Sequence, residues 1–186
     1  MTTKKYAKEY LYREIREIEN NIDLNAIPDL TVYKKAIIFK YSEDGYEDLN
    51  EKLRLSKGRD ISDFGILLNE CLSKLPDYQG IVYRGDEISK LEFDKYVLCY
   101  ENVIPYHEFS FFSTSKSKSK AYERCKGRGY RILFKILSKK GKDIERFSKY
   151  KTDREVLLQI NSIFNVDLIE KVERETNFYR ITLTEQ

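Results

Sequence analysis

The spacing of apolar residues changes near Gly80, and that change constrains the fold more than any other feature of the sequence. Upstream, apolar side chains recur every three or four residues, which is the period of an amphipathic helix. Downstream, short runs rich in β-branched and aromatic residues are typical of strands. Helices followed by strands predict an α+β domain, in which a helical layer precedes a mixed or antiparallel β core.

The pattern predicts one domain over residues 1–186, with a helical lead-in over 1–75 and a β-rich core over 80–186. Upstream, we expect helices at 4–20, at 30–39 after the start signal Pro28-Asp29, at 46–55, and from Ser62 or Asp63 to about Leu75, with a turn at 42–45. Downstream, we expect strands at 81–83, 96–100, 107–112, 130–137, 155–160, 166–172 and 178–183, and one helix at 115–124.

The composition suits a folded intracellular domain. Hydrophobic residues make up 41% of the chain, which is enough for a core, and no apolar run approaches the length of a membrane-spanning helix. The first residues lead into a charged amphipathic stretch, which is unlike a secretory leader. The three widely spaced cysteines argue against a disulfide framework or a zinc site, and a single histidine, His107, offers little for metal binding. We therefore predict that the protein resides in a reducing cytosol.

The net charge of +3 hides a strongly basic block. Residues 111–154 carry 15 basic and 4 acidic side chains, a net charge of +11, whereas residues 61–110 carry 4 and 9. One interpretation is a solvated helix face with its neighbouring loop. The other is a field that attracts phosphates, an acidic protein or nucleic acid.

Three segments within the β-rich part carry chemistry. Arg84 follows a β-prone run, and its planar guanidinium beside Gly85 can hold a phosphate, or form a simple surface ion pair. The cluster 113–115 ends another strand, where Ser115 can cap the following helix. Phe111 and Phe112 precede the cluster on alternate faces, so we expect one ring in the core and the other as an aromatic wall of a pocket.

Glu155 is the strongest candidate for catalysis. The apolar residues 156–158 follow it and predict a buried strand. A carboxylate at the start of such a strand is costly unless it has a partner or a chemical role. An ion pair at the edge of the sheet is the structural alternative. Asp153, two residues earlier, is either part of the site or a simple turn residue.

The order of these segments resembles the arginine–serine–glutamate branch of the mono-ADP-ribosyltransferases, a family that includes bacterial exotoxins and effectors. The resemblance runs from about residue 36 to 166. Its supporting positions include 36–42, Tyr46, Asn50, Leu53, Arg54, Leu75, Pro76, 80–85, Gly141, Ile144, Ser148, 153–157, Phe164 and Val166. It implies two packed sheets that form a cleft for NAD, with no metal.

The resemblance also implies a role for individual residues. Glu155 would stabilise the positive charge that develops on the ribose as nicotinamide leaves, and Ser113 would orient its carboxylate. Basic residues around Gly127 and Gly129 either cover the phosphates or form a solvated turn. The residues expected to bind NAD are Arg84, Gly85, Phe112, Ser113, Thr114, Ser115 and Arg128.

Asp153 departs from the family pattern. At this position the family commonly carries Glu where arginine is modified, and Gln where the acceptor is asparagine or another side chain. Asp keeps the carboxylate but shortens the side chain by one carbon–carbon bond, about 1.5 Å. The negative charge of Asp153 therefore favours an arginine acceptor, whereas its shorter side chain leaves the acceptor type open. The loop Ser148–Arg154, with the aromatic Tyr150, is expected to recognise a protein acceptor.

The resemblance thus implies an NAD-dependent mono-ADP-ribosyltransferase acting in the cytoplasm, with delivery into a host cell as an effector left open. An NAD glycohydrolase could use the same site, with water as the acceptor. A non-enzymatic module that binds nucleic acid or phosphate through residues 111–154 is the alternative from another class. Nucleic acid could also be the acceptor.

Overall fold

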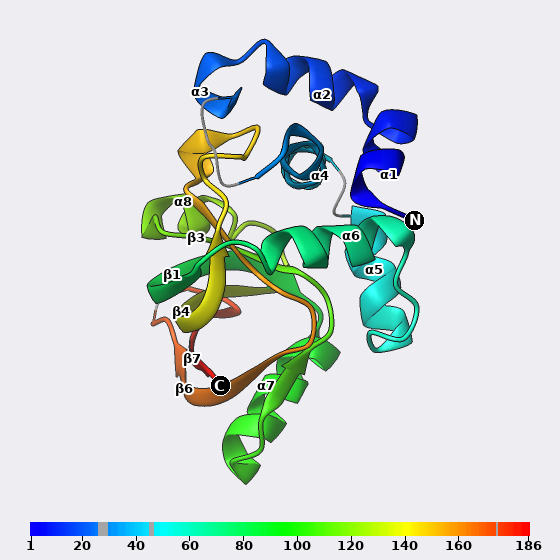
Figure 1. Ribbon diagram of the computed structural model, residues 1–186. Helices are drawn as coiled ribbons and strands as arrows, with labels where there is room; N and C mark the ends of the chain where they lie inside the picture. Colours follow the sequence, from blue (N-terminus) through cyan, green and yellow to red (C-terminus); the bar gives the residue numbers. More distant parts are fainter. Residues whose placement is uncertain (26–29, 45–46, 174) are drawn as a thin grey trace.

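The N-terminal helices form a layer at one end of the molecule (Figure 1). The computed structural model describes residues 1–25, 30–44, 47–173 and 175–186. Thr2, Thr31 and Ser62 each accept a hydrogen bond from a backbone N–H three residues on, which fixes the start of a helix. The helices before the first strand are α1 (Thr3–Tyr10), α2 (Tyr12–Glu19), α3 (Ile22–Asn25), α4 (Val32–Glu43), α5 (Glu47–Ser56) and α6 (Asp63–Leu72).

Several helix boundaries differ from the prediction. The single helix expected over 4–20 breaks at Leu11, whose φ of −124° and ψ of 36° are not helical. The break lets both α1 and α2 turn apolar side chains toward α4. α4 continues through Glu43 into the expected turn, and α6 ends at Leu72. Pro28, Asp29, Gly45 and Tyr46 lie outside the described residues.

The strands form one hydrogen-bonded network in the order β1-β3-β5-β4-β7-β6-β2, with β1 also paired to β4. Every pair is antiparallel except β4 with β7. The two expected sheets are therefore joined, because β1 meets β3 at Tyr83↔Ser115 and the end of β4 meets β5 at Lys142↔Leu157 and Asp143↔Val156. The strands are β1 (Asp77–Ile88), β2 (Tyr106–Glu108), β3 (Phe112–Ser115), β4 (Tyr130–Asp143), β5 (Glu155–Leu158), β6 (Ser162–Lys171) and β7 (Phe178–Glu185).

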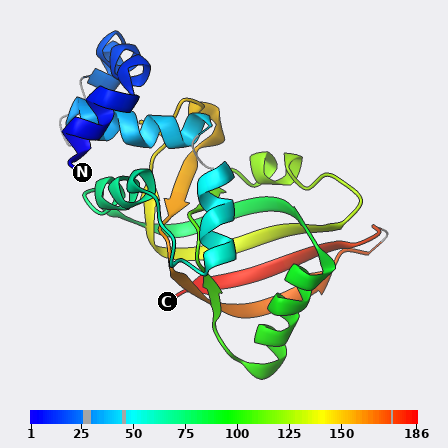
Figure 2. The same ribbon diagram turned by 90° about the vertical axis from the view of Figure 1, so that its right-hand side faces the viewer.

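The β3–β5 pair lies between two apolar cores. On one side, Phe111 and Leu157 pack into the core of the helical layer. On the other side, Phe112, Val156 and Leu158 pack against residues of β1, β4, β6 and β7. The pair is therefore buried on both faces, and Figure 2 shows the helical layer standing over one end of the sheet.

The strand predicted at 96–100 is wrong, because these residues belong to helix α7 (Lys90–Asn102). Ser89 and Glu92 form a reciprocal capping box at its start. Tyr96 then stacks on Tyr106 of β2, with ring centroids 4.1 Å apart. Helical spacing brings Phe93 to the same side, where it contacts Tyr130 and Tyr179.

The strand predicted at 107–112 is divided between β2 and β3. The Glu108 carboxylate accepts hydrogen bonds from the Ser110 backbone N–H and hydroxyl, at 2.8 and 2.6 Å, which turns the chain. The helix predicted at 115–124 is the shorter α8 (Lys118–Glu123), and Ser117 caps it. Ser115 does not cap α8: its hydroxyl donates to the Asp153 carbonyl and accepts from the backbone N–H of Ser117, which lies before the helix.

Across the residues that the structure describes, no helix has the length and apolar character that a membrane crossing requires. In the same ranges, no group of three or more His, Cys, Asp or Glu side chains is arranged to hold a metal ion.

Candidate active site

A cleft lies where β1, β3, β5 and α8 meet. Its narrow part, ≈210 Å³, lies against β1 and α8, and its wider part, ≈480 Å³, extends toward α4 and α5. The predicted arginine, serine and glutamate are therefore brought together from three distant segments. The residues that line both parts are Arg84, Ser113, Arg124, Asp153 and Glu155.

The serine cluster binds β5 through successive side chains. The Ser113 hydroxyl donates to Oε1 of Glu155 at 2.5 Å, and the Thr114 hydroxyl donates to the Val156 carbonyl at 2.5 Å. Ser115 donates to the Asp153 carbonyl at 2.6 Å. The backbone register, with Ser115 opposite Glu155, supports these contacts. β3 therefore fixes both the position and the direction of the Glu155 carboxylate.

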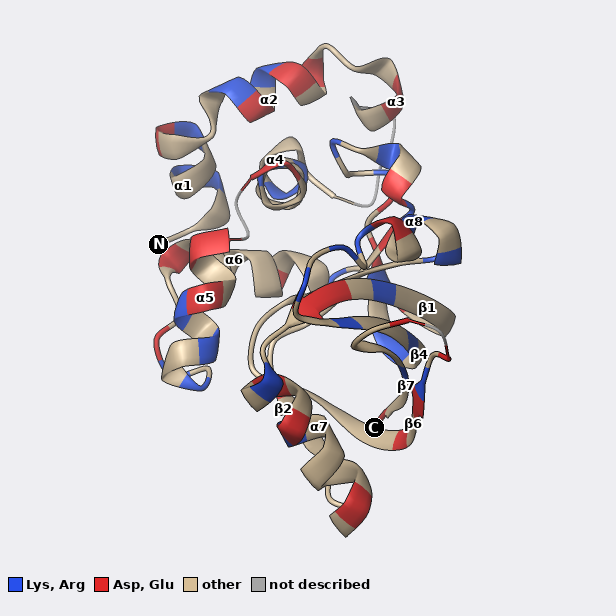
Figure 3. Cartoon of the chain, turned by 180° about the vertical axis from the view of Figure 1, so that it is seen from behind, with Lys and Arg blue, Asp and Glu red and all other residues tan. Residues whose placement is uncertain are grey.

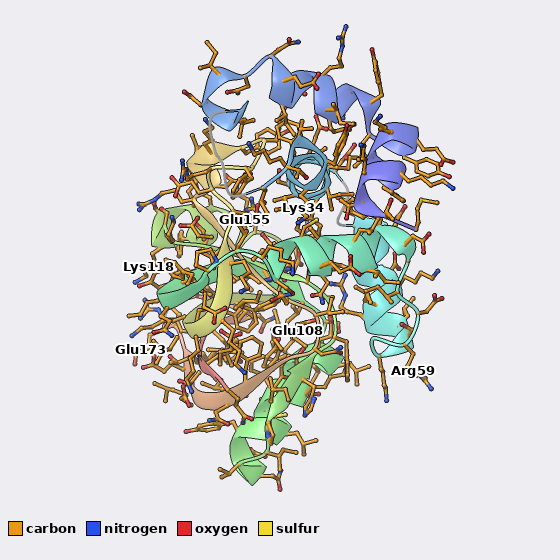
Figure 4. The ribbon with its side chains drawn as sticks, in the orientation of Figure 1. Lys34, Arg59, Glu108, Lys118, Glu155 and Glu173 are labelled. Carbon is orange, nitrogen blue, oxygen red and sulfur yellow. The ribbon has the colours of Figure 1, made fainter. Side chains whose placement is uncertain are left out.

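The Glu155 carboxylate lies in the interior, between the helical layer and the sheet (Figure 4), and the residue is 8% exposed. Burial raises the pKa of Glu155 to about 7, while the hydrogen bond from Ser113 and the charge of Arg124 act in the opposite direction. A group with this pKa exchanges its proton near neutral pH. In its ionised form it is a fixed negative charge within a low-dielectric cleft.

Arg84 is held by three groups. Its Nη1 donates to the Ser113 carbonyl at 3.0 Å, and its Nε and Nη2 donate to Oδ2 of Asp86 at 3.0 and 2.6 Å. The guanidinium carbon lies 4.7 Å from the centroid of the Phe112 ring. Arg84 therefore supports β3 next to Ser113 while its side chain, 24% exposed, still reaches the cleft.

The expectation of an aromatic wall is not met. Phe111 packs in the helical core, edge-on to Tyr41, and Phe112 packs in the β core. Neither ring is among the residues that line the cleft. Phe112 instead lies beneath the Arg84 guanidinium and lines a separate cavity of ≈190 Å³ that Arg84 also reaches. Alternation did separate the two rings, but both are buried because β3 has a core on each face.

Gly85 permits close packing of α8 on β1. A Cβ atom at this position would lie 1.8 Å from the Ala121 carbonyl oxygen and 2.9 Å from Sγ of Cys125. Gly85 also lines the narrow part of the cleft. The absent side chain therefore lets α8 bring Lys120 and Arg124 over the cleft, and an NAD contact for Gly85 stays a prediction.

Asp153 ends a 3-10 turn (Lys151–Asp153) two residues before Glu155. The next residue, Arg154, has a φ of +48°, and this left-handed turn redirects the chain into β5. Oδ2 of Asp153 accepts a hydrogen bond from Nη2 of Arg124 at 2.8 Å. The carboxylate that was expected to meet an acceptor therefore already binds a guanidinium of its own chain.

The loop Ser148–Arg154 reaches the wider part of the cleft. Tyr150 is 52% exposed and lines this part together with Thr152. The backbone N–H of Lys149 donates to the Ser42 hydroxyl at 2.9 Å, which fixes the loop to the helical layer. Arg128, by contrast, is an exposed residue between α8 and β4 and is not among the residues that line the cleft.

Helices α4 and α5 form one wall of the wider part of the cleft. The sequence had not predicted a role in the site for the residues of this wall. Asn50 accepts from the Phe111 backbone N–H at 3.0 Å and donates to the Tyr41 hydroxyl at 3.2 Å. These bonds tie the helical layer to the entry of β3. The sequence carried a signal for this wall, since Asn50 and Arg54 are four residues apart and therefore lie on one face of a helix. The lining residues without a predicted role include Tyr41, Glu47, Asn50, Arg54, Asp86 and Lys120, whereas Arg124 belongs to the basic residues predicted either to cover the phosphates or to form a solvated turn.

The cleft combines cations with one buried carboxylate. Arg54, Arg84, Lys120 and Arg124 can bind an anionic group such as a pyrophosphate. Glu155 can stabilise a positive charge on a group held beside it. Figure 3 shows that basic residues also lie on α8, at the rim of the same site.

Comparison with known proteins gives concordant results. A family model described as an ADP-ribosyltransferase exoenzyme matches residues 3–186. The Vibrio splendidus protein Vis, named as an NAD(+)–arginine ADP-ribosyltransferase, is 27% identical over 159 residues, which cover 79% of this chain and 63% of Vis. The chain thus spans less than two thirds of the length of that curated relative.

Solved structures share the fold at lower identity. ADP-ribosyltransferase HopU1 of Pseudomonas syringae pv. Tomato DC3000 has a TM-score of 0.75 and 19% identity, covering 100% of this chain and 88% of HopU1. Exoenzyme S of Pseudomonas aeruginosa, solved with human 14-3-3 protein beta and carba-NAD, has a TM-score of 0.73 and 17% identity, covering 98% and 86%. The predicted α+β fold class is confirmed.

Proposed function

The chain belongs to the ADP-ribosyltransferase exoenzyme family, and on that premise we propose that it cleaves the nicotinamide–ribose bond of NAD and transfers ADP-ribose to an acceptor. The observation that carries this proposal is the Ser113–Glu155 hydrogen bond of 2.5 Å, within one cleft that also contains Arg84. This arrangement matches the arginine–serine–glutamate order seen in the sequence. It holds a buried carboxylate in a fixed direction next to a group that binds anions.

Glu155 supplies the electrostatic part of the proposed reaction. As the bond between C1′ and the nicotinamide nitrogen breaks, its electron pair leaves with nicotinamide and positive charge develops on the ribose. An ionised carboxylate beside the ribose stabilises that charge, and a fixed position avoids the cost of reorienting it. The acceptor atom then bonds to C1′ and loses a proton, which balances the transfer.

Arg84 and its neighbours hold the co-substrate. The Arg84 guanidinium is already oriented by Asp86 and Ser113, so little side-chain freedom is lost when it meets a phosphate. Lys120 approaches from α8, and Arg54 approaches from α5. We assign the pyrophosphate to these cations and the nicotinamide ribose to the region of Ser113 and Glu155.

The proposed acceptor is a protein arginine. Asp153 places a carboxylate at the cleft beside Glu155, and a guanidinium is its natural partner. The name of Vis, an NAD(+)–arginine ADP-ribosyltransferase, supports the same acceptor class. The half-exposed Tyr150 on the loop Ser148–Arg154 offers an aromatic anchor for that protein. The three cysteines are unpaired thiols, which suits action in a reducing compartment such as a host cytoplasm.

A module that binds nucleic acid through residues 111–154 is less favoured. Many cations of this block already have acidic partners, which reduces the field available to a polyanion. The block residues in ion pairs include Lys116, Lys120, Arg124, Arg131, Lys142, Lys149 and Lys151.

A product analysis with labelled NAD tests the proposal. The full chain and Glu155→Gln are incubated with NAD and with an arginine-containing acceptor such as polyarginine or agmatine, and products are separated by chromatography. Transfer to the acceptor that is lost in Glu155→Gln supports the transferase. Free ADP-ribose as the sole product identifies a glycohydrolase. No NAD consumption by the unaltered chain contradicts the enzymatic proposal.

A further inference from the structure

Arg124 carries the same guanidinium group as the proposed acceptor, and it already lies in the cleft. It follows the last turn of α8, and its Nη2 donates to Oδ2 of Asp153 at 2.8 Å. Arg124, Asp153 and Glu155 line both parts of the cleft. A guanidinium of this chain thus binds the carboxylate that would bind the acceptor guanidinium.

The contact is suited to exchange. The Arg124 side chain is 58% exposed and that of Asp153 is 32% exposed, so water screens the pair. Within the described residues, Asp153 is the acidic side chain that pairs with Arg124. An incoming guanidinium can therefore replace Arg124 without opening a buried network, whereas Arg84 is fixed by Asp86, Ser113 and Phe112.

We propose that Arg124 is an internal substitute for the acceptor guanidinium, which occupies Asp153 until an acceptor arginine displaces it. Arg124 would then set the affinity for guanidine acceptors and make Asp153 selective for those that can compete. The inference rests on the proposed transfer to arginine, and it concerns acceptor binding, which does not require the bond in NAD to break.

Binding of agmatine to the full-length chain tests this directly, in the absence of NAD. Calorimetric titration compares the unaltered chain with Arg124→Gln, which removes the internal guanidinium, and with Arg124→Lys, which keeps a cation. Lys118→Gln, on the same helix and outside the lining of the cleft, is the control for lost positive charge. The double variant Arg124→Gln with Asp153→Asn tests whether any effect passes through Asp153.

Arg124→Gln is expected to tighten agmatine binding by about two- to fivefold, the range for a partly exposed ion pair. Arg124→Lys and Lys118→Gln are expected to stay within the error of the unaltered chain, and the double variant is expected to lose the gain. Unchanged or weaker binding by Arg124→Gln, or a gain that persists in the double variant, overturns the inference.

The proposed function fails by a different result. Nicotinamide release from NAD by the unaltered chain, compared with Glu155→Gln, reports on bond cleavage without any guanidine acceptor. Absent release would contradict the enzymatic proposal while the agmatine titration still decides the role of Arg124. Release with no gain in agmatine binding would keep the enzymatic proposal and remove the inference.

Discussion

The two sides of the cleft are built in different ways. On the β3–β5 side, Ser113 and Glu155 meet through a hydrogen bond between strands that have an apolar core on each face. On the side formed by α8 and the 3-10 turn, Arg124 and Asp153 meet through an ion pair open to water. The first side is therefore buried, whereas the second is held by an exposed ion pair that an incoming group can replace.

This difference separates two tasks. A charge that develops during bond cleavage is best stabilised by groups that do not move, which suits the buried side. An acceptor that must enter and leave is best bound by groups whose interactions with the free protein are weak, which suits the exposed side. Substitutions on the buried side should therefore lower the rate of NAD cleavage, and those on the exposed side should change acceptor affinity.

The largest expected effect is that of Glu155→Gln. We expect nicotinamide release to fall by roughly 10²–10³-fold, because the amide keeps the shape and loses the negative charge. Initial rates at saturating NAD measure the loss. Because the substitution also removes a buried charge, the midpoint of thermal unfolding is compared between the two chains to check that the variant is folded. A rate within a few-fold of the unaltered chain would place the stabilising charge elsewhere.

Gly85→Ala tests the packing of α8, which belongs to the exposed side of the cleft, against β1. The added Cβ would overlap the Ala121 carbonyl oxygen, so α8 must move, at a cost of about 1–3 kcal/mol. Denaturant unfolding measures the loss of stability. Gly129→Ala is the matched control, because its nearest neighbour, 2.8 Å away, is the flexible end of the Glu87 side chain. Equal stability of the two variants would contradict close packing of α8.

Ser113→Ala should change the pH dependence. The ionised form of Glu155 is the active one, so the rate of nicotinamide release should rise with pH around a pKa of about 7. The Ser113 hydroxyl lowers this pKa, so its loss should move the midpoint to higher pH and reduce the rate near neutrality about tenfold. A pH–rate profile of both chains measures the shift. An unchanged midpoint would show that the Ser113 hydroxyl does not influence the pKa of Glu155.

The same pKa has a consequence for stability. Burial raises the pKa of Glu155 from 4.5 to about 7, so the folded state holds the proton more tightly than the unfolded state. Its contribution to the free energy of unfolding is complete below pH 4.5 and declines as the pH rises toward 7. Glu155→Gln should remove that part of the decline, which urea unfolding at several pH values measures.

The smallest expected effect is that of Asp153→Asn. Its ion pair with Arg124 is exposed, so we expect about a two- to fivefold change in the KM for agmatine and little change in nicotinamide release. Steady-state kinetics with each substrate varied in turn separates the two. A loss of NAD cleavage comparable with that of Glu155→Gln would show that the two sides of the cleft do not act separately.

The sequence predicted most of the buried side and little of the exposed one. Arg84, Ser113 and Glu155 each adjoin apolar residues with strand character, so local pattern placed them on strands, and the resemblance to the ADP-ribosyltransferases implied that they share one site. The pair of Arg124 with Asp153 depends on the packing of α8 against Gly85, a tertiary contact with no local pattern. Arg128, four positions further along the same basic run, lies outside the cleft lining for the same reason.

The error at residues 96–100 has a physical explanation. Tyr96, Val97 and Tyr100 favour strands individually, and this local preference outweighed the capping box of Ser89 and Glu92. The helical spacing of Phe93 and Tyr96, which both face the sheet, was the decisive signal. Tertiary burial of one helical face thus overrode residue propensity.

Nicotinamide release and transfer to agmatine, measured side by side for the unaltered chain, Glu155→Gln and Asp153→Asn, test the account most directly. We predict that Glu155→Gln loses both activities, whereas Asp153→Asn retains release and shows only an altered agmatine KM. Retention of release by Glu155→Gln, or loss of release by Asp153→Asn, would contradict the division of the cleft into a buried catalytic side and an exposed acceptor side.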